Sequence, residues 1–245
     1  MKSPKYRKRF YRDWVYPGAL HEARLCVQET DLHILCDRPI DAAFCRERIK
    51  LYRGQIEEYI NHKEPLFLTS LSPIPVEAGA PRIVREMAGQ CRKAGVGPMA
   101  AVAGAIAQFL GGDLLRKGFR TVIIENGGDI FLKTERKTAV GIYAGRSRFS
   151  RALALAFEPG QTPLGVCTSS GTVGHSLSFG SADSVTIVAR SALLADACAT
   201  AVANRVKTGK DLEGAVEFAR TVRGVRGVLI IFRDTLASWG AIELV

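Results

Sequence analysis

The first third of the chain changes from a strand-like to a helix-like pattern. Apolar and polar residues alternate over residues 23–36 around a polar break at 29–31, which predicts a β-hairpin. From Pro39 to about Asn61 the apolar residues recur at helical spacing, and this predicts one long helix. Residues 68–81 contain three prolines and predict a connection to the rest of the chain.

The remaining sequence shows one order of elements twice, an alanine-rich helix followed by antiparallel strands. Helices are predicted at 99–117, 192–206 and 212–222, and strands at 120–125, 129–133, 139–144, 152–159, 184–189, 227–234 and 238–245. The pattern predicts a mixed α/β (α+β) fold in a single domain with a weak internal duplication. We divide the chain into an N-terminal appendage at about 1–78, a first pseudo-repeat at about 79–150 and a second at about 151–245.

Length and composition favour one globular unit. With 245 residues and 47% hydrophobic content, the chain is long enough to bury a sizeable core. Its apolar runs are interrupted before the roughly 20 residues of a membrane-spanning helix. The basic first 14 residues are not followed by the apolar stretch of a secretory signal. We therefore expect a cytoplasmic protein without a membrane partner.

Cysteine and charge content restrict the partners. Six cysteines stand singly without CxxC spacing, which predicts reduced thiols rather than a zinc site or disulfides. A net charge of +10 favours an anionic partner such as a nucleotide. Basic and aromatic residues interleave over residues 1–12, a pattern compatible with a nucleic-acid-binding arm. No nucleic-acid motif follows, so we favour a solvated or subunit-clasping arm and do not expect a nucleic-acid partner.

Gly97-Pro98 opens the first alanine-rich helix and is the first candidate site. Free backbone N–H groups in a first helical turn favour a phosphate or a carboxylate. The small residues that follow, including Ala103 and Gly104, would allow a ligand or another backbone to approach closely. Ordinary tight helix packing is the alternative.

The second candidate is the turn Asn126-Gly127-Gly128, because Asn-Gly is typical of a two-residue hairpin. A turn alone would explain it. The acids on either side, Glu125 and Asp129, must however be solvated, hydrogen-bonded or part of a functional site.

The third candidate is residues 168–176, rich in Ser, Thr and Gly and ending near His175. Gly171 and Gly174 permit positive φ angles, so successive N–H groups could converge on an oxyanion or a phosphate. A flexible linker is the alternative.

Asp196 and Thr200 form the fourth candidate, since residues four apart share a helix face. Burying a carboxylate in an alanine-rich helix is costly unless the carboxylate is paired or binds a metal. A carboxylate and a hydroxyl are oxygen ligands that Mg²⁺ accepts, usually with waters and substrate phosphates. A structural hydrogen bond is the alternative.

The blocks GPMAAVAGAIAQ, ENGGDI, TSSGTVGHS and ADACATAVAN, taken in order over about residues 79–205, resemble the signature of the ApbE superfamily. The members of this superfamily are FAD-dependent protein-FMN transferases. The residues of the four blocks are most similar to those of a cytoplasmic, uncharacterised prokaryotic branch of UPF0280 type. The resemblance implies a tunnelling-fold (T-fold) duplication, two related units of antiparallel sheet plus helices. It implies catalytic roles for His175 and Asp196, with Asp196 and Thr200 as magnesium ligands. The residues implied to lie at FAD or a related nucleotide are Gly97, Met99, Ala100, Asn126, Gly127, Gly128, Asp129, Ser169, Ser170, Gly171 and Thr172.

The chain departs from the transferase pattern in two places. Val96-Gly97-Pro98-Met99-Ala100-Ala101 stands where the transferases have Lys-Gly-aromatic-Ala-Val-Asp. A Ser-Leu-Ser-Phe-Gly run follows His175 in place of the family's Pro-Arg-Thr-Gly block. The acceptor and the retention of catalysis therefore stay open.

Three hypotheses on function follow. The first is a magnesium-dependent flavin nucleotide binding or transfer protein, with phosphoryl transfer to a protein acceptor. The second, which the resemblance to the UPF0280-type branch implies, is a sulfur-assimilation factor for homocysteine formation in anaerobes, using Cys167 and Cys198, which lie inside the motifs. The third is a non-catalytic module that binds a ligand, an RNA or a protein, and a homo-oligomer is compatible with each of them.

Overall fold

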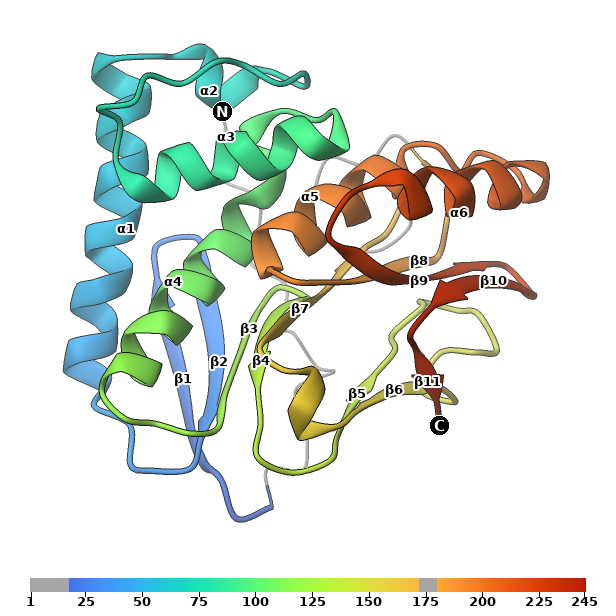
Figure 1. Ribbon diagram of the computed structural model, residues 1–245, viewed down its shortest axis with the longest axis horizontal. Helices are drawn as coiled ribbons and strands as arrows, with labels where there is room; N and C mark the ends of the chain where they lie inside the picture. Colours follow the sequence, from blue (N-terminus) through green and yellow to red (C-terminus); the bar gives the residue numbers. More distant parts are fainter. Residues whose placement is uncertain (1–17, 172–179) are drawn as a thin grey trace.

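A computed structural model describes residues 18–171 and 180–245, and its centre is an eight-stranded antiparallel sheet (Figure 1). The strand order is β1-β2-β3-β4-β7-β8-β9-β10. Its strands are β1 His21–Val27, β2 Thr30–Cys36, β3 Val122–Asn126, β4 Asp129–Lys133, β7 Leu164–Ser169, β8 Ser184–Ala189, β9 Val225–Phe232 and β10 Thr235–Gly240.

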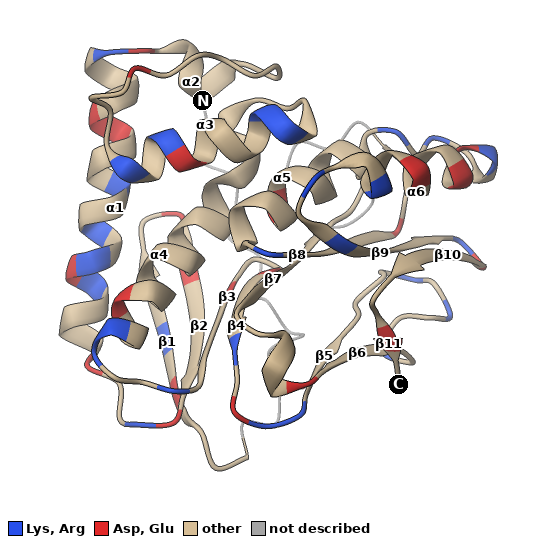
Figure 2. Cartoon of the chain, in the orientation of Figure 1, with Lys and Arg blue, Asp and Glu red and all other residues tan. Residues whose placement is uncertain are grey.

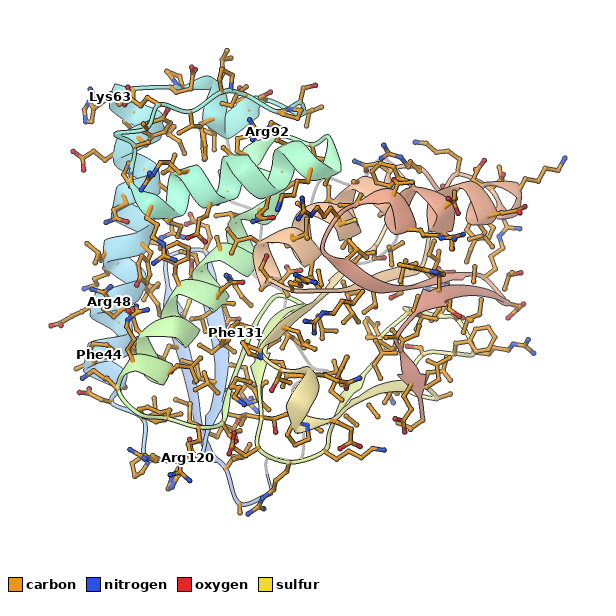
Figure 3. All side chains as sticks on the ribbon, viewed as in Figure 1. Phe44, Arg48, Lys63, Arg92, Arg120 and Phe131 are labelled. Atoms are coloured by element: carbon orange, nitrogen blue, oxygen red, sulfur yellow. The ribbon has the colours of Figure 1, made fainter. Side chains whose placement is uncertain are left out.

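The helices cover one face of this sheet (Figure 1). They are α1 Ala42–His62, α2 Leu66–Thr69, α3 Arg82–Ala94, the 3₁₀ helix η2 Pro98–Ala101, α4 Val102–Arg116, α5 Ala192–Ala203 and α6 Leu212–Thr221. The main core lies between these helices and the sheet. Phe131 of β4 contributes to it, lying against Gly111 of α4, where a Cβ would approach the ring to 2.3 Å (Figure 3).

A second, smaller sheet lies across the opposite face, in the order β11-β6-β5. Its strands are β5 Thr138–Gly141, β6 Ala154–Phe157 and β11 Glu243–Leu244. Phe157 and Leu155 of β6 and Leu164 and Val166 of β7 belong to a second apolar core. Alternate residues of the central strands therefore serve two different cores, as the period of two in a strand requires.

The structure confirms the mixed α/β fold and most of the predicted elements. The hairpin at 21–36 and the helix at 42–62 are present, and Gly97-Pro98 does open the alanine-rich helix. The strand predicted at 139–144 corresponds to β5, but its pairing differs from the prediction, because β5 does not continue the β3-β4 meander. It pairs with β6 in the second sheet, and β7 is the neighbour of β4.

The sheet contains the same order of elements twice. β1, β2, helices, β3 and β4 make one half, and β7, β8, helices, β9 and β10 make the other. The N-terminal hairpin pairs with β3 through β2. We therefore infer that the first unit starts at β1 rather than near residue 79, and that β5, β6 and β11 lie outside both units.

One helical stretch within the described part of the chain, Pro98–Arg116, has the length and apolar composition of a membrane-spanning helix, and more than half of it is buried. In this fold its α4 portion packs on β3, β4 and α5, as a core helix does.

Candidate functional site

The site is built where the start of α4 meets α5. Gly104 makes this contact close, because a Cβ at this position would lie 2.4 Å from the carbonyl oxygen of Ala192. Across the contact, the backbone N–H of Gly104 donates to Oδ2 of Asp196 at 2.9 Å. The first turn of α4 thus directs its free amides at a carboxylate, one of the two ligands expected for such a turn.

Asp196 is buried, with 9% of its surface exposed, and its carboxylate interacts with backbone amides. Burial raises the pKa of its carboxyl group to about 7, although the amides of Gly104 and Ala103 favour the charged form. No ion pair with a lysine or arginine is formed in the described part of the chain to offset this burial. A cation at this carboxylate would do so.

The Asn126 turn reaches the same helix start. The side-chain amide of Asn126 donates from Nδ2 to the carbonyl oxygen of Ala103 at 3.1 Å. Gly127 and Gly128 have φ angles of 72° and 104°, so both are left-handed, and Asn126 pairs with Asp129 across the two-residue turn. The turn conformation explains both glycines, as the predicted hairpin requires.

Two side chains of β7 face the helices beside this turn. Cys167 pairs in register with Asp129 and is fully buried, and its Sγ contacts the carbonyl oxygen of Ala192 at 3.4 Å. Burial raises the pKa of the Cys167 thiol, and the neighbouring carboxylates of Asp129 and Asp196 raise it further. Cys167 is therefore a neutral thiol in this environment.

Ser169 follows two residues later on the same face of β7 and is 8% exposed. Its hydroxyl is buried and has no hydrogen-bond partner among the described residues. Native proteins satisfy nearly all such groups, so an unpartnered hydroxyl next to the site indicates a place where a ligand or water completes the structure.

The oxygen donors at α5 fit a magnesium ion that also binds phosphate. Asp196 supplies one buried carboxylate, and Thr200 lies one turn further along, half-buried. Among the described residues no group of three His, Cys, Asp or Glu side chains is placed to hold a metal. This sparse donor set suits Mg²⁺, which binds through one or two carboxylates with waters and substrate phosphates.

The other predicted site residues are placed differently. Gly97 packs closely against the backbone of Ser70, because a Cβ at this position would lie 1.7 Å from the Ser70 carbonyl oxygen. Met99 and Ala100 lie half-buried in η2, before the turn of α4 that meets Asp196. Gly171 donates its N–H to the carbonyl of Ala182. Ser170 follows β7 directly, and Thr172 and His175 lie outside the described residues.

The sequence predicted that a ligand or another backbone approaches closely at Ala103 and Gly104, and at Gly104 the Ala192 backbone does so. Sequence reasoning missed Gln108, whose Oε1 accepts the N–H of Ala192 at 2.7 Å and so caps the start of α5. A glycine within the first turn of an apolar helix was the available signal for the close contact with α5.

Comparison with known proteins identifies the family of this chain. The family model described as AbpE bacteria matches residues 12–225. A UPF0280 protein of Methanothermobacter thermautotrophicus is 45% identical over 226 residues, covering 89% of this chain and 85% of that protein. A UPF0280 protein of Methanosarcina acetivorans is 40% identical over 217 residues, with 88% and 85% covered. The chain belongs to the ApbE-like UPF0280 family.

The UPF0280 chain also shares its fold with solved ApbE structures. The flavinyl transferase ApbE of Pseudomonas stutzeri superposes with a TM-score of 0.58 at 12% identity, covering 90% of this chain and 94% of that one. The ApbE protein of Thermotoga maritima gives 0.58 at 16% identity, with 91% and 96% covered. At this identity the likeness establishes the fold, as the resemblance of the sequence blocks predicted.

Proposed function

We propose that this protein binds a flavin nucleotide such as FAD with Mg²⁺ at the α4–α5 contact and transfers its FMN portion to a hydroxyl of a protein acceptor. The observation that carries the proposal is the buried Asp196 carboxylate, held by the Gly104 amide and without a cationic side chain among the described residues. The structural neighbours are named flavin transferases, which supports flavin as the nucleotide.

Asp196 and Thr200 would hold the metal, with nucleotide phosphates completing its ligands. Magnesium bound there would polarise the pyrophosphate and balance the charge that grows on the leaving oxygens. Asn126 fixes the start of α4 through the Ala103 carbonyl, and Ser169 offers a hydroxyl to the nucleotide.

The proposed reaction is a single phosphoryl transfer. The bond between the FMN phosphorus and the bridging oxygen breaks, and AMP leaves with the electron pair. A new bond forms between that phosphorus and the acceptor hydroxyl oxygen, whose proton must pass to a base. The family resemblance implies a catalytic role for His175, and we propose it as this base.

The sulfur-assimilation hypothesis gains no support from the two thiols it needs. Burial raises the pKa of Cys198 to about 12, and Cys167 is held neutral as well. A thiolate is the reactive form of cysteine, so neither side chain is prepared for sulfur transfer. The magnesium-dependent flavin reaction is the function that the site favours.

Release of AMP from FAD tests the proposal. The wild-type protein should release AMP with Mg²⁺ and a hydroxyl-bearing acceptor peptide, and no AMP with EDTA. Asp196→Asn keeps an acceptor oxygen for the Gly104 amide but removes the charge, so its rate should fall at least about 100-fold, which corresponds to about 2.7 kcal/mol of lost transition-state stabilisation. Asp234→Asn changes an exposed carboxylate and is the matched control.

Wild-type activity in Asp234→Asn combined with loss in Asp196→Asn supports the site. Undiminished AMP release by Asp196→Asn would disprove the assigned role of this carboxylate.

A further inference from the structure

An exposed apolar cluster lies at the outer end of the helical layer. Leu66, Leu68 and Leu71 are 59%, 54% and 61% exposed within six residues of chain. Three leucines this exposed and this close together in the chain are a candidate interaction site, because exposed apolar patches usually mark one. Figure 1 shows α2, which carries the first two, beyond the end of α1 and away from the sheet.

This leucine cluster is held in place by buried neighbours. Phe67, between the first two leucines, is fully buried and packs edge-on against the Tyr59 ring at 5.4 Å. The carbonyl of Leu71 accepts the N–H of Gly97 at 2.9 Å. The leucines are therefore presented outward by an anchored segment, so fraying does not explain their exposure.

Charge around the leucine cluster indicates what kind of partner fits. The whole chain carries +10, yet residues 57–93 contain five acidic and five basic residues and are neutral. Lys63 and Arg92 lie on this end of the molecule among acids such as Glu64, and Figure 2 shows both signs along the surrounding helices (Figure 3 labels the two cations). A strongly acidic partner or an anionic lipid surface would find no net attraction here.

A second copy of the chain fits this surface better. Two copies of a +10 protein repel each other, and this repulsion is smallest where both surfaces are neutral. An apolar centre with rim charges of both signs is complementary to itself, as a two-fold interface must be. We propose that Leu66, Leu68 and Leu71 form the centre of a symmetric dimer interface. The proposal does not depend on the flavin reaction.

Sedimentation velocity of the full chain at roughly 1 to 100 μM tests it, because dimers of moderate affinity dissociate in this range. The wild-type protein should form a dimer as concentration rises. The variant Leu66→Ser/Leu68→Ser/Leu71→Ser should weaken dimerisation at least about 100-fold, since the three leucines of each copy lose their burial. Leu51→Ser alters a 43% exposed leucine of α1 outside the cluster and should dimerise normally.

Near-ultraviolet circular dichroism and thermal unfolding of each variant would show that its core is intact, independently of nucleotide binding. A wild-type protein that stays monomeric over this concentration range would overturn the proposal. The same holds for a monomer that sediments with vesicles of anionic phospholipid. Dimerisation of the triple serine variant with wild-type affinity would overturn it too, since the contact would then lie elsewhere.

Discussion

At the scale of single residues, two buried serines form a natural comparison. Ser169 and Ser184 both have buried hydroxyls without a partner among the described residues. Ser169 lies on the same face of β7 as Cys167, toward the helices, whereas Ser184 pairs in register with Ile231, a residue of the second core. Only Ser169 lies where the proposed nucleotide binds.

Substitution by alanine should therefore separate the two serines. Removing an unsatisfied buried hydroxyl should leave the free energy of unfolding unchanged or raise it by up to about 1 kcal/mol in both variants. FAD affinity measured by calorimetry should fall about tenfold in Ser169→Ala and stay at the wild-type value in Ser184→Ala. Equal affinities in the two variants would exclude a ligand role for Ser169.

Asp113 stabilises the α1–α4 contact. It is 6% exposed and accepts hydrogen bonds from Tyr52 Oη at 2.6 Å, Arg48 Nε at 2.6 Å and Arg116 Nη2. Burial alone would raise the pKa of Asp113, but the hydrogen bonds from these three side chains outweigh it and hold the pKa below its ordinary value.

Asp113→Asn should lower the free energy of unfolding at pH 7 by about 1.5 to 3 kcal/mol, because a neutral amide weakens the charge-assisted hydrogen bonds with Arg48 and Arg116. A carboxyl group with a lowered folded-state pKa stabilises the protein above its unfolded pKa and loses this effect as pH falls. In urea denaturation the difference from wild type should therefore shrink below about pH 4. A difference that does not change between these pH values would contradict the assigned ionic role.

At the scale of elements, the packing of α4 on α5 depends on Gly104. A methyl group at this position would meet the Ala192 carbonyl and lie 3.0 Å from Cβ of Asp196. Gly104→Ala should cost about 1 to 3 kcal/mol of stability and weaken Mg²⁺-dependent FAD binding, since the two helices must separate.

Gly54→Ala is the matched control for this change. Gly54 lies within α1, and a methyl group added there would meet no atom within 4 Å. Alanine should therefore stabilise the helix by about 0.5 to 1 kcal/mol without affecting binding. Thermal unfolding and calorimetry on both variants would check this contrast. A stable, fully binding Gly104→Ala protein would contradict the described contact.

Much of the element level could be predicted, because periodicity reports local structure directly. The β1–β2 hairpin and the helices α1, α4 and α5 follow their patterns closely. The placement of β5 could not be predicted in this way, since its alternation of exposed and half-buried residues resembles that of any edge strand. β5 pairs with β6, and β6 pairs on its other side with β11 at the far end of the chain.

At the scale of the whole molecule, the fold brings together three motifs that are distant in sequence. Gly104, Asn126 and Asp196 come from separate segments, and the sheet order places β3 and β4 beside β7 beneath α4 and α5. The sequence blocks indicated these segments through their family resemblance. They did not indicate that Gly97 packs on Ser70 while the following turn serves Asp196. The different use of Gly97 depends on its close contact with the Ser70 backbone, and no pattern in the sequence reports such a contact.

The most direct test of the central claim is a calorimetric titration of the wild-type protein with FAD, in Mg²⁺ and in EDTA. We predict that FAD binds in Mg²⁺ and that its affinity is at least about tenfold lower in EDTA. The pyrophosphate and the buried Asp196 carboxylate are both negative, so a cation must lie between them before FAD binds tightly. Equal affinity in both buffers, or no binding in either, would contradict the proposed metal-dependent flavin site.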